Sequence, residues 1–154
     1  MGAQIGELMA RFGKYRVTLV DVKDEFVSKG LVGIEQRTEK FFVAKGKMTP
    51  EEKKELLSLI DGTTDIGQAS AGADFVLEAA TENIGIKKEL FRKCDQSAPE
   101  RVIIASNTSY LSITEIASAN QSSGQGRGNA LFQSCRCDET CGSRERGKDF
   151  RKHC

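Results

Sequence analysis

Two short apolar runs, separated by one helix-length segment, constrain this chain more than any other feature of its sequence. The runs span residues 74–77 and 101–105; each is too short for a helix, and the second is β-branched at its centre. Residues 84–97 lie between them and are predicted to be a helix, which Pro99 ends. The apolar side chains of that helix at helical spacing are Ile86, Leu90, Phe91 and Cys94. A strand–helix–strand unit of this length predicts two parallel strands joined by a right-handed crossover.

Polar side chains gather directly after each of these two predicted strands. Glu78 and Glu82 follow the first strand, and Asn107 and Ser109 follow the second. Ligands of open parallel sheets bind outside the carboxyl ends of the strands, so a site is expected at residues 79–83 and 106–109. The alternative is that these residues are ordinary caps and turns, since Ser112 also begins a capping box for a further helix.

The first part of the chain predicts a helix, then a strand that ends in an acid. The helix spans Gly2–Gly13, and its expected apolar face comprises Ile5, Leu8, Met9 and Phe12. The strand spans Arg16–Asp21, and Asp21 lies 19 residues after Gly2. That spacing is close to the ~20 residues expected for an acid that binds the adenosine ribose of a dinucleotide. A carboxylate there favours NAD over NADP, whose 2′-phosphate it would repel; an ordinary helix-capping Asp is the alternative.

Residues 23–65 predict a helical insertion, two helices that separate the strand at Arg16–Asp21 from the next strand of the sheet. In a complete Rossmann-type sheet these would be the second and third strands. A long charged helix is expected over Lys23–Lys45, and a helix that starts with a capping box at Thr49 is expected to run through Ile60. A short strand is expected at Thr63–Asp65. The fold class is therefore α/β, with an incomplete Rossmann-type parallel sheet.

Three sequence motifs make the chain resemble the NAD-binding domain of the 3-hydroxyacyl-CoA dehydrogenase family. They are EAATEN at 78–83, IKKELF at 86–91 and IIASNTSYLSITEIA at 103–117. The resemblance implies that Glu82 lies beside the nicotinamide ribose and that Lys87 is also in the NAD site. It further implies that Ser109 contacts both NAD and substrate, with Asn107 beside it.

The same resemblance indicates that the dinucleotide fingerprint is only partly present. The fingerprint G-x-G-x-x-G follows a strand and opens a helix, and here Met1 and Gly2 correspond to its last two residues. The first strand and the first two glycines are expected to be absent, so two neighbouring strands lose their ladder partner. Gly2, at the start of a helix, is still expected to attract phosphate.

Charge and cysteine usage exclude several kinds of partner. The chain has 23 basic and 22 acidic residues, so neither nucleic-acid binding nor an anionic membrane surface is indicated. No apolar run approaches the roughly 18 residues of a membrane span, and no signal peptide is recognised. Cys94, the one cysteine outside the last 20 residues, is expected to be buried and reduced, which predicts a cytoplasmic protein.

The composition changes after residue 120, so residues 1–120 are interpreted as a partial NAD-binding domain and 121–154 as an aberrant, disordered tail. A metal site is one interpretation of the tail; its ligands would be Cys135, Cys137, Cys141, His153 and Cys154. A basic disordered segment is the second interpretation. A shifted reading frame is the favoured interpretation. Residues 129–147 can be encoded by codons that, when read one nucleotide out of frame, give MHFFNPVAVMKLVEVVRG. That sequence resembles the family's catalytic segment.

The resemblance implies NAD-dependent oxidation of L-3-hydroxyacyl-CoA to 3-oxoacyl-CoA, in fatty-acid β-oxidation or in 3-hydroxybutyryl-CoA metabolism. The family's histidine base and its paired glutamate are expected to be absent, as His153, the sole histidine, has no matching context. The dimerisation domain of the family is expected to be absent as well. We therefore expect an inactive fragment, with no catalytic residue and no metal site of its own. The alternatives are a non-catalytic nucleotide-binding module and, third, a metal-binding protein that uses the tail cysteines.

Overall fold

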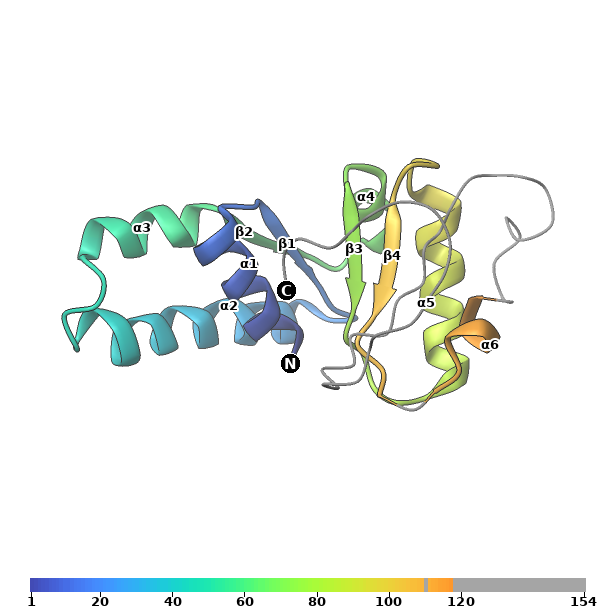
Figure 1. The fold of residues 1–154 in the computed structure, drawn as a ribbon, viewed down its shortest axis with the longest axis horizontal. Helices are drawn as coiled ribbons and strands as arrows, with labels where there is room; N and C mark the ends of the chain where they lie inside the picture. Colours follow the sequence, from blue (N-terminus) through green and yellow to red (C-terminus); the bar gives the residue numbers. More distant parts are fainter. Residues whose placement is uncertain (110, 118–154) are drawn as a thin grey trace, which may run out of the picture.

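The computed structural model describes residues 1–109 and 111–117, which form alternating helices and short strands (Figure 1). The predicted tail from residue 121 lies outside these residues. The elements, in chain order, are α1 (Gly2–Gly13), β1 (Val17–Val20), α2 (Asp24–Thr38), the π-helical turn η1 (Glu39–Val43), α3 (Pro50–Ser58), β2 (Ile60–Thr63), α4 (Ile66–Ala71), β3 (Phe75–Glu78), α5 (Ile84–Ser97), β4 (Ile103–Ser106) and α6 (Ile113–Ala117).

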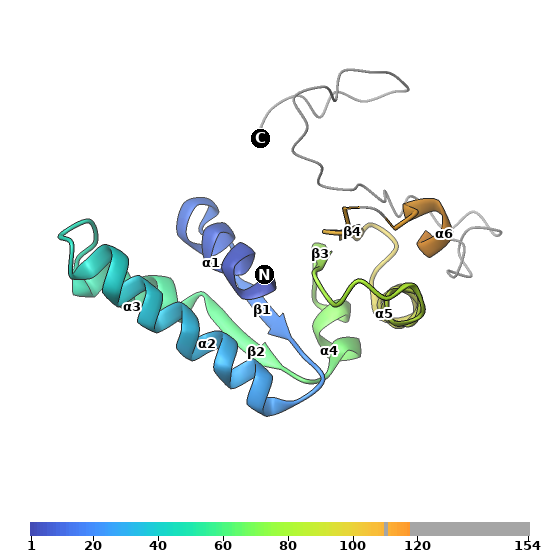
Figure 2. The same ribbon diagram turned by 90° about the horizontal axis from the view of Figure 1, so that it is seen from below.

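The strands form two parallel pairs. β1 pairs with β2, from Val17 opposite Ile60 onward, and β3 pairs with β4, from Phe75 opposite Ile103 onward. Figures 1 and 2 show β1 and β3 as the inner strands of the two pairs. Among residues 1–109 and 111–117, no ladder joins β1 to β3. The prediction of an α/β fold with a parallel Rossmann-type sheet is confirmed.

The bounds of α1 are as predicted, but two residues of its predicted apolar face are largely exposed. Leu8 and Phe12 are 51% and 71% exposed, whereas Gly6 and Ala10 are buried. A Cβ atom added at Gly6 would lie only 3.1 Å from side-chain atoms of both Val17 and Leu19. The helix therefore packs on β1 through its small residues, because only these let its backbone come so close to the strand.

The helical insertion is confirmed between β1 and β2, although its end was misplaced. α3 ends at Ser58, and Ile60 already belongs to β2, where it is buried opposite Val17. The strand predicted at Thr63–Asp65 therefore starts three residues earlier than expected. Asp65 instead caps α4, which was not predicted: its Oδ1 accepts from the backbone N–H of Gln68 at 2.9 Å.

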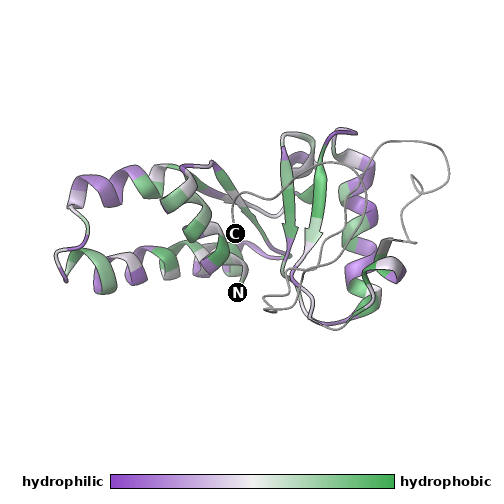
Figure 3. Ribbon diagram, in the orientation of Figure 1, coloured by the Kyte–Doolittle hydropathy of each residue, from purple (hydrophilic) through white to green (hydrophobic). Residues whose placement is uncertain are grey.

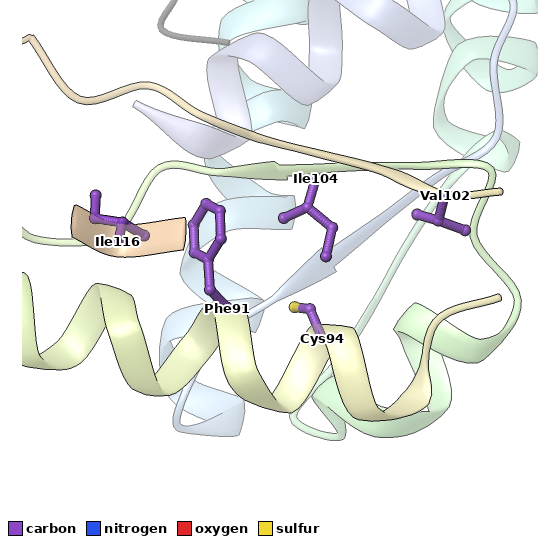
Figure 4. Close-up of a cluster of buried hydrophobic side chains, with 5 residues drawn as sticks. All are labelled: Phe91, Cys94, Val102, Ile104 and Ile116. Carbon is purple, nitrogen blue, oxygen red and sulfur yellow. The ribbon is translucent and has the colours of Figure 1, made fainter. Parts of the chain in front are cut away.

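Two hydrophobic clusters hold the fold together, one on each strand pair. The first comprises Ala10, Ile34, Leu56 and Ile60. The second, drawn in Figure 4, comprises Phe91, Cys94, Val102, Ile104 and Ile116. Figure 3 shows that β3 and β4 are largely hydrophobic while α5 carries many hydrophilic residues, so α5 meets the strands through one narrow face.

That face of α5 matches the prediction at Phe91 and Cys94 but not at Ile86. Ile86 is 46% exposed, while Lys87, Phe91 and Cys94 are buried. Cys94 is buried as expected, and its burial raises the pKa of the thiol above its ordinary value. The thiol is thereby kept protonated and unreactive at neutral pH, as expected of a cysteine that serves as a small apolar core residue.

Replacing Thr38 by valine is expected to raise the free energy of unfolding by about 1 kcal/mol. Thr38 is fully buried, and its hydroxyl has no hydrogen-bond partner among the described residues. Thr38→Val replaces that hydroxyl with a methyl group of similar size, whereas the control Thr38→Ser keeps the hydroxyl and removes a methyl group. Urea unfolding followed by circular dichroism should give Thr38→Val a higher free energy of unfolding than the parent chain and Thr38→Ser a lower one. The reverse order would show that the hydroxyl is hydrogen-bonded.

Candidate functional site

The carboxyl ends of β3 and β4 are joined by a buried polar network. Glu78 is the last residue of β3 and Ser106 the last of β4, and both are buried. The ammonium group of Lys87, from α5, donates to the two carboxylate oxygens of Glu78 at 2.8 and 2.9 Å. The hydroxyl of Ser106 donates to the same carboxylate. These contacts tie three elements together at the edge where the sequence predicts a site.

Lys87 lies beneath this edge rather than on its surface. Its side chain is 1% exposed, and its ammonium group also donates to the carbonyl oxygen of Ala80 at 3.2 Å. The carboxylate of Glu82 is 3.8 Å away. A buried ammonium group with this set of oxygen partners is compensated within the protein. The resemblance implies that Lys87 contacts the cofactor directly, and this stays a prediction. The geometry favours a role in which Lys87 holds Glu78 and Glu82 in place.

Glu82 is the member of this group that reaches solvent. Its side chain is 36% exposed, and one carboxylate oxygen accepts from the hydroxyl of Thr108 at 2.8 Å. Thr108 is buried, and its backbone N–H donates to Ser106 Oγ at 3.3 Å. The network therefore orients Glu82 outward from a rigid base. The roles of Ser106 and Thr108 were not predicted, although both lie within the predicted segment 106–109.

Asn107 and Ser109 flank Thr108 on the same loop. The backbone N–H of Asn107 donates to the carbonyl oxygen of Glu78 at 2.8 Å, which extends the β3–β4 pairing by one residue. Ser109 is exposed and Asn107 is half-buried. Asn83, in contrast, is an ordinary cap: its Oδ1 accepts from the first N–H groups of α5. The cap interpretation is thus correct for Asn83, while Glu82 and the residues around Thr108 form a connected group.

The two residues predicted in the first part of the chain lie at the end of β1 and at the start of α1. Asp21 directly follows β1, is exposed, and accepts from the N–H of Val22 at 2.7 Å. No side chain caps the start of α1, where Gly2 lies. A Cβ atom added at Gly2 would be 3.5 Å from Ala79 Cβ, so the start of α1 adjoins the loop that follows β3. The approach of α1 to this loop is visible in Figure 2.

This arrangement fits a dinucleotide. An exposed carboxylate after β1 can accept hydrogen bonds from two ribose hydroxyls, and an uncapped helix start attracts phosphate. Glu82 offers a second outward carboxylate on the loop after β3. No group of three metal-ligating side chains occurs among residues 1–109 and 111–117. No helix in the described part of the chain is both long and apolar enough to cross a membrane.

Comparison with known proteins agrees with this geometry. The family model described as the 3-hydroxyacyl-CoA dehydrogenase NAD-binding domain matches residues 1–130. The mitochondrial hydroxyacyl-coenzyme A dehydrogenase of Sus scrofa is 39% identical over 125 residues, which cover 77% of this chain and 39% of the relative. The 3-hydroxyadipyl-CoA dehydrogenase of Escherichia coli is 38% identical over 117 residues, which cover 76% of this chain and 24% of the relative.

Solved structures show the same similarity. The (S)-3-hydroxybutyryl-CoA dehydrogenase of Ralstonia eutropha superposes with a TM-score of 0.73 at 36% identity, over 79% of this chain and 42% of that one. The 3-hydroxybutyryl-CoA dehydrogenase of E. coli K12 superposes with a TM-score of 0.71 at 38% identity, over 76% of this chain and 24% of that one. The chain thus spans less than half the length of these relatives. It belongs to the 3-hydroxyacyl-CoA dehydrogenase family and corresponds to the family's NAD-binding domain.

Proposed function

We propose that this chain is the NAD-binding part of a dehydrogenase that oxidises L-3-hydroxyacyl-CoA to 3-oxoacyl-CoA. The observation that carries the proposal is the approach of the start of α1, at Gly2, to the loop after β3, which bears the outward carboxylate of Glu82; an exposed carboxylate, Asp21, directly follows β1. NAD, when bound, supplies the hydride acceptor of such a reaction. The chain's own residues bind and orient it: Asp21 receives the adenosine ribose, and Gly2 faces the pyrophosphate.

Glu82 supports the nicotinamide end of the same proposal. Its carboxylate is held by the Thr108 hydroxyl and lies 3.8 Å from the Lys87 ammonium group. A carboxylate fixed from below in this way is ready to accept a hydrogen bond from a ribose without reorganising. Ser109, exposed on the neighbouring loop, is assigned to the side of the site where an acyl-CoA substrate would lie.

We further propose that the chain alone does not turn over substrate. Hydride leaves the 3-carbon of the substrate only as its hydroxyl proton is removed, and this requires a general base. The imidazole of His153 is the only one in the chain, and it has no sequence context that matches the family's base. The chain therefore acts as a nucleotide-binding module unless a base and an acyl-CoA cleft are supplied by further protein.

A spectrophotometric assay tests this second proposal. NADH and acetoacetyl-CoA are mixed with the purified chain, and absorbance at 340 nm is followed. We expect no acetoacetyl-CoA-dependent NADH oxidation, while NADH added alone binds to the chain. Turnover that is lost on His153→Ala would contradict the proposal. Turnover that persists in that variant would also contradict it and would point to a different base.

Asp21→Ala is expected to weaken NAD binding by about 10- to 100-fold, since a hydrogen bond to a charged group contributes about 1.5–3 kcal/mol. NADP binding should fall much less or improve, because the carboxylate no longer repels the 2′-phosphate. Asp24→Asn is the matched control: it removes another exposed carboxylate, three residues further along the chain. Calorimetric titration with both nucleotides measures the effect, and equal losses in the two variants would show that Asp21 has no specific role.

We also propose a cytosolic location for the protein. Cys94, the only cysteine in the described part of the chain, is buried and free, which is typical of a reducing compartment. Relatives in human and pig are named mitochondrial, so an organelle is the competing location. Fractionation of cells that produce the full chain should recover it in the cytosol, and recovery in an organelle would contradict the proposal.

A further inference from the structure

The polar network after β3 and β4 carries an unbalanced negative charge. It contains two carboxylates, Glu78 and Glu82, and one ammonium group, that of Lys87. Its other side chains, Ser106 and Thr108, are neutral. Within residues 1–109 and 111–117, no other cationic side chain forms an ion pair with either carboxylate. The three charged groups therefore leave a formal charge of −1.

This excess charge lies on the solvent side of the network, at Glu82. The ammonium group of Lys87 donates to both oxygens of Glu78, at 2.8 and 2.9 Å, but lies 3.8 Å from Glu82. Lys87 and Glu78 are 1% and 5% exposed, whereas Glu82 is 36% exposed. The start of α5, just past Glu82, contributes about half a positive charge, which offsets the carboxylate only in part.

The carboxylate of Glu82 is also fixed in direction. Its Oε2 accepts from the hydroxyl of Thr108 at 2.8 Å, and that hydroxyl in turn accepts from the N–H of Leu111 at 3.2 Å. The ammonium group of Lys87 faces the same oxygen, Oε2. In the part of the chain that the structure describes, no hydrogen bond or ion pair engages Oε1. Glu82 therefore presents one oxygen and its negative charge to a ligand without rearranging.

The two redox forms of the cofactor differ in charge only at the nicotinamide. The ring of NAD⁺ is cationic, whereas the ring of NADH is neutral. In the proposed function Asp21 receives the adenosine ribose and Gly2 faces the pyrophosphate. A Cβ atom at Gly2 would be 3.5 Å from Ala79 Cβ, in the loop after β3, so the cofactor's other end would extend over the loops that follow β3 and β4. Glu82 is the outward carboxylate of these loops.

We propose that the fixed negative charge of Glu82 raises the affinity of this chain for NAD⁺ relative to NADH. This inference rests on the proposed function. The carboxylate attracts the cationic ring of NAD⁺ and has no such interaction with the neutral ring of NADH. Lys87 does not cancel the attraction, because its ammonium group is buried against Glu78. The site would thus favour the form of the cofactor that accepts a hydride.

Calorimetric titration of the full chain with NAD⁺, NADH and ADP-ribose tests this inference. Glu82→Gln keeps the length of the side chain and an oxygen that can accept from Thr108, but removes the charge. We expect the Kd for NAD⁺ to rise about three- to tenfold more than the Kd for NADH. ADP-ribose contains both riboses but no nicotinamide. Its Kd should therefore change by the same factor as that of NADH.

Two further variants separate charge from shape. Asp21→Asn removes the same charge at the adenosine end, so it should weaken NAD⁺ and NADH binding by equal factors. Glu82→Asp keeps the charge and shortens the side chain, so it should retain the parent's ratio of the two Kd values. Each result is a ratio measured on one protein. A partly unfolded variant lowers both apparent affinities alike and leaves that ratio unchanged.

The outcomes distinguish this inference from the proposed function. Equal changes of the two Kd values in Glu82→Gln would overturn the inference while NAD binding, and with it the proposed function, remained. A change of the ratio in Asp21→Asn as large as in Glu82→Gln would also overturn it, because the effect would then come from the overall charge of the chain. A parent chain that binds none of the three nucleotides would overturn both the inference and the proposed function.

Discussion

Lys87→Met is expected to lower the free energy of unfolding by about 3–5 kcal/mol, the cost of removing one partner of a buried ion pair. The variant leaves the carboxylate of Glu78, which is 5% exposed, without its main positive partner. The hydroxyl of Ser106 and the N–H of Ala80 still donate to it but carry no compensating charge. Urea unfolding monitored by circular dichroism at neutral pH measures the loss.

Lys88→Met is the matched control for this experiment. Lys88 is the next residue of α5, and its ammonium group is paired with Glu115 at 2.8 Å in a largely exposed position. Exposed ion pairs contribute about 0–1 kcal/mol, so this variant should unfold almost as the parent chain does. Equal losses of unfolding free energy in the two variants would show that the buried Glu78–Lys87 ion pair contributes no more to stability than the exposed Lys88–Glu115 pair.

Phe91→Ala is expected to cost about 3–5 kcal/mol of unfolding free energy, the usual range for truncating a buried aromatic side chain. Phe91 is 1% exposed and lies in the cluster with Ile104 and Ile116, as Figure 4 shows. Its removal leaves a cavity between α5, β4 and α6, which the short strands cannot close. Thermal unfolding followed by circular dichroism should show a large fall in the midpoint temperature.

Ile86→Ala is the matched control, since Ile86 is on the same helix but 46% exposed. It should cost less than about 1 kcal/mol, because little apolar surface is lost from the core. The pair of variants also tests whether Ile86 belongs to the buried face of α5. If Ile86→Ala proved as damaging as Phe91→Ala, Ile86 would lie in the core as its spacing predicted, and the observed packing would be wrong.

Element bounds were predictable where local chemistry marks them. α5 begins after the Asn83 cap and ends before Pro99, and α3 begins at the capping box of Thr49 and Glu52. The start of β2 was predicted three residues too late, because Ile60 follows a run of residues with high helix propensity and neither proline nor glycine separates them. Its strand conformation comes from pairing with Val17, a contact 43 positions away in the sequence that local propensity does not register.

The buried helix faces were harder to predict than the helices themselves. Apolar spacing favoured Ile86 and Leu8, yet the structure buries Lys87 and Glu7, each with a partner of opposite charge. A sequence pattern treats such residues as solvent-facing, because burial becomes tolerable only when the partner is in place. The connection of the polar residues after β3 and β4 was predictable for a different reason. The carboxyl-end rule depends on topology alone, so it identified the segments around Glu82 and Asn107 without knowledge of their contacts.

The most direct test of the account is a map of NAD on the chain by ¹H–¹⁵N correlation spectroscopy. The full chain is labelled with ¹⁵N and titrated with NAD, and amide shifts are followed residue by residue. We predict the largest shifts at Gly2, at Asp21, and in residues 79–82 and 107–109. Shifts centred on α3, or no shifts at NAD concentrations that saturate a full-length relative, would contradict it.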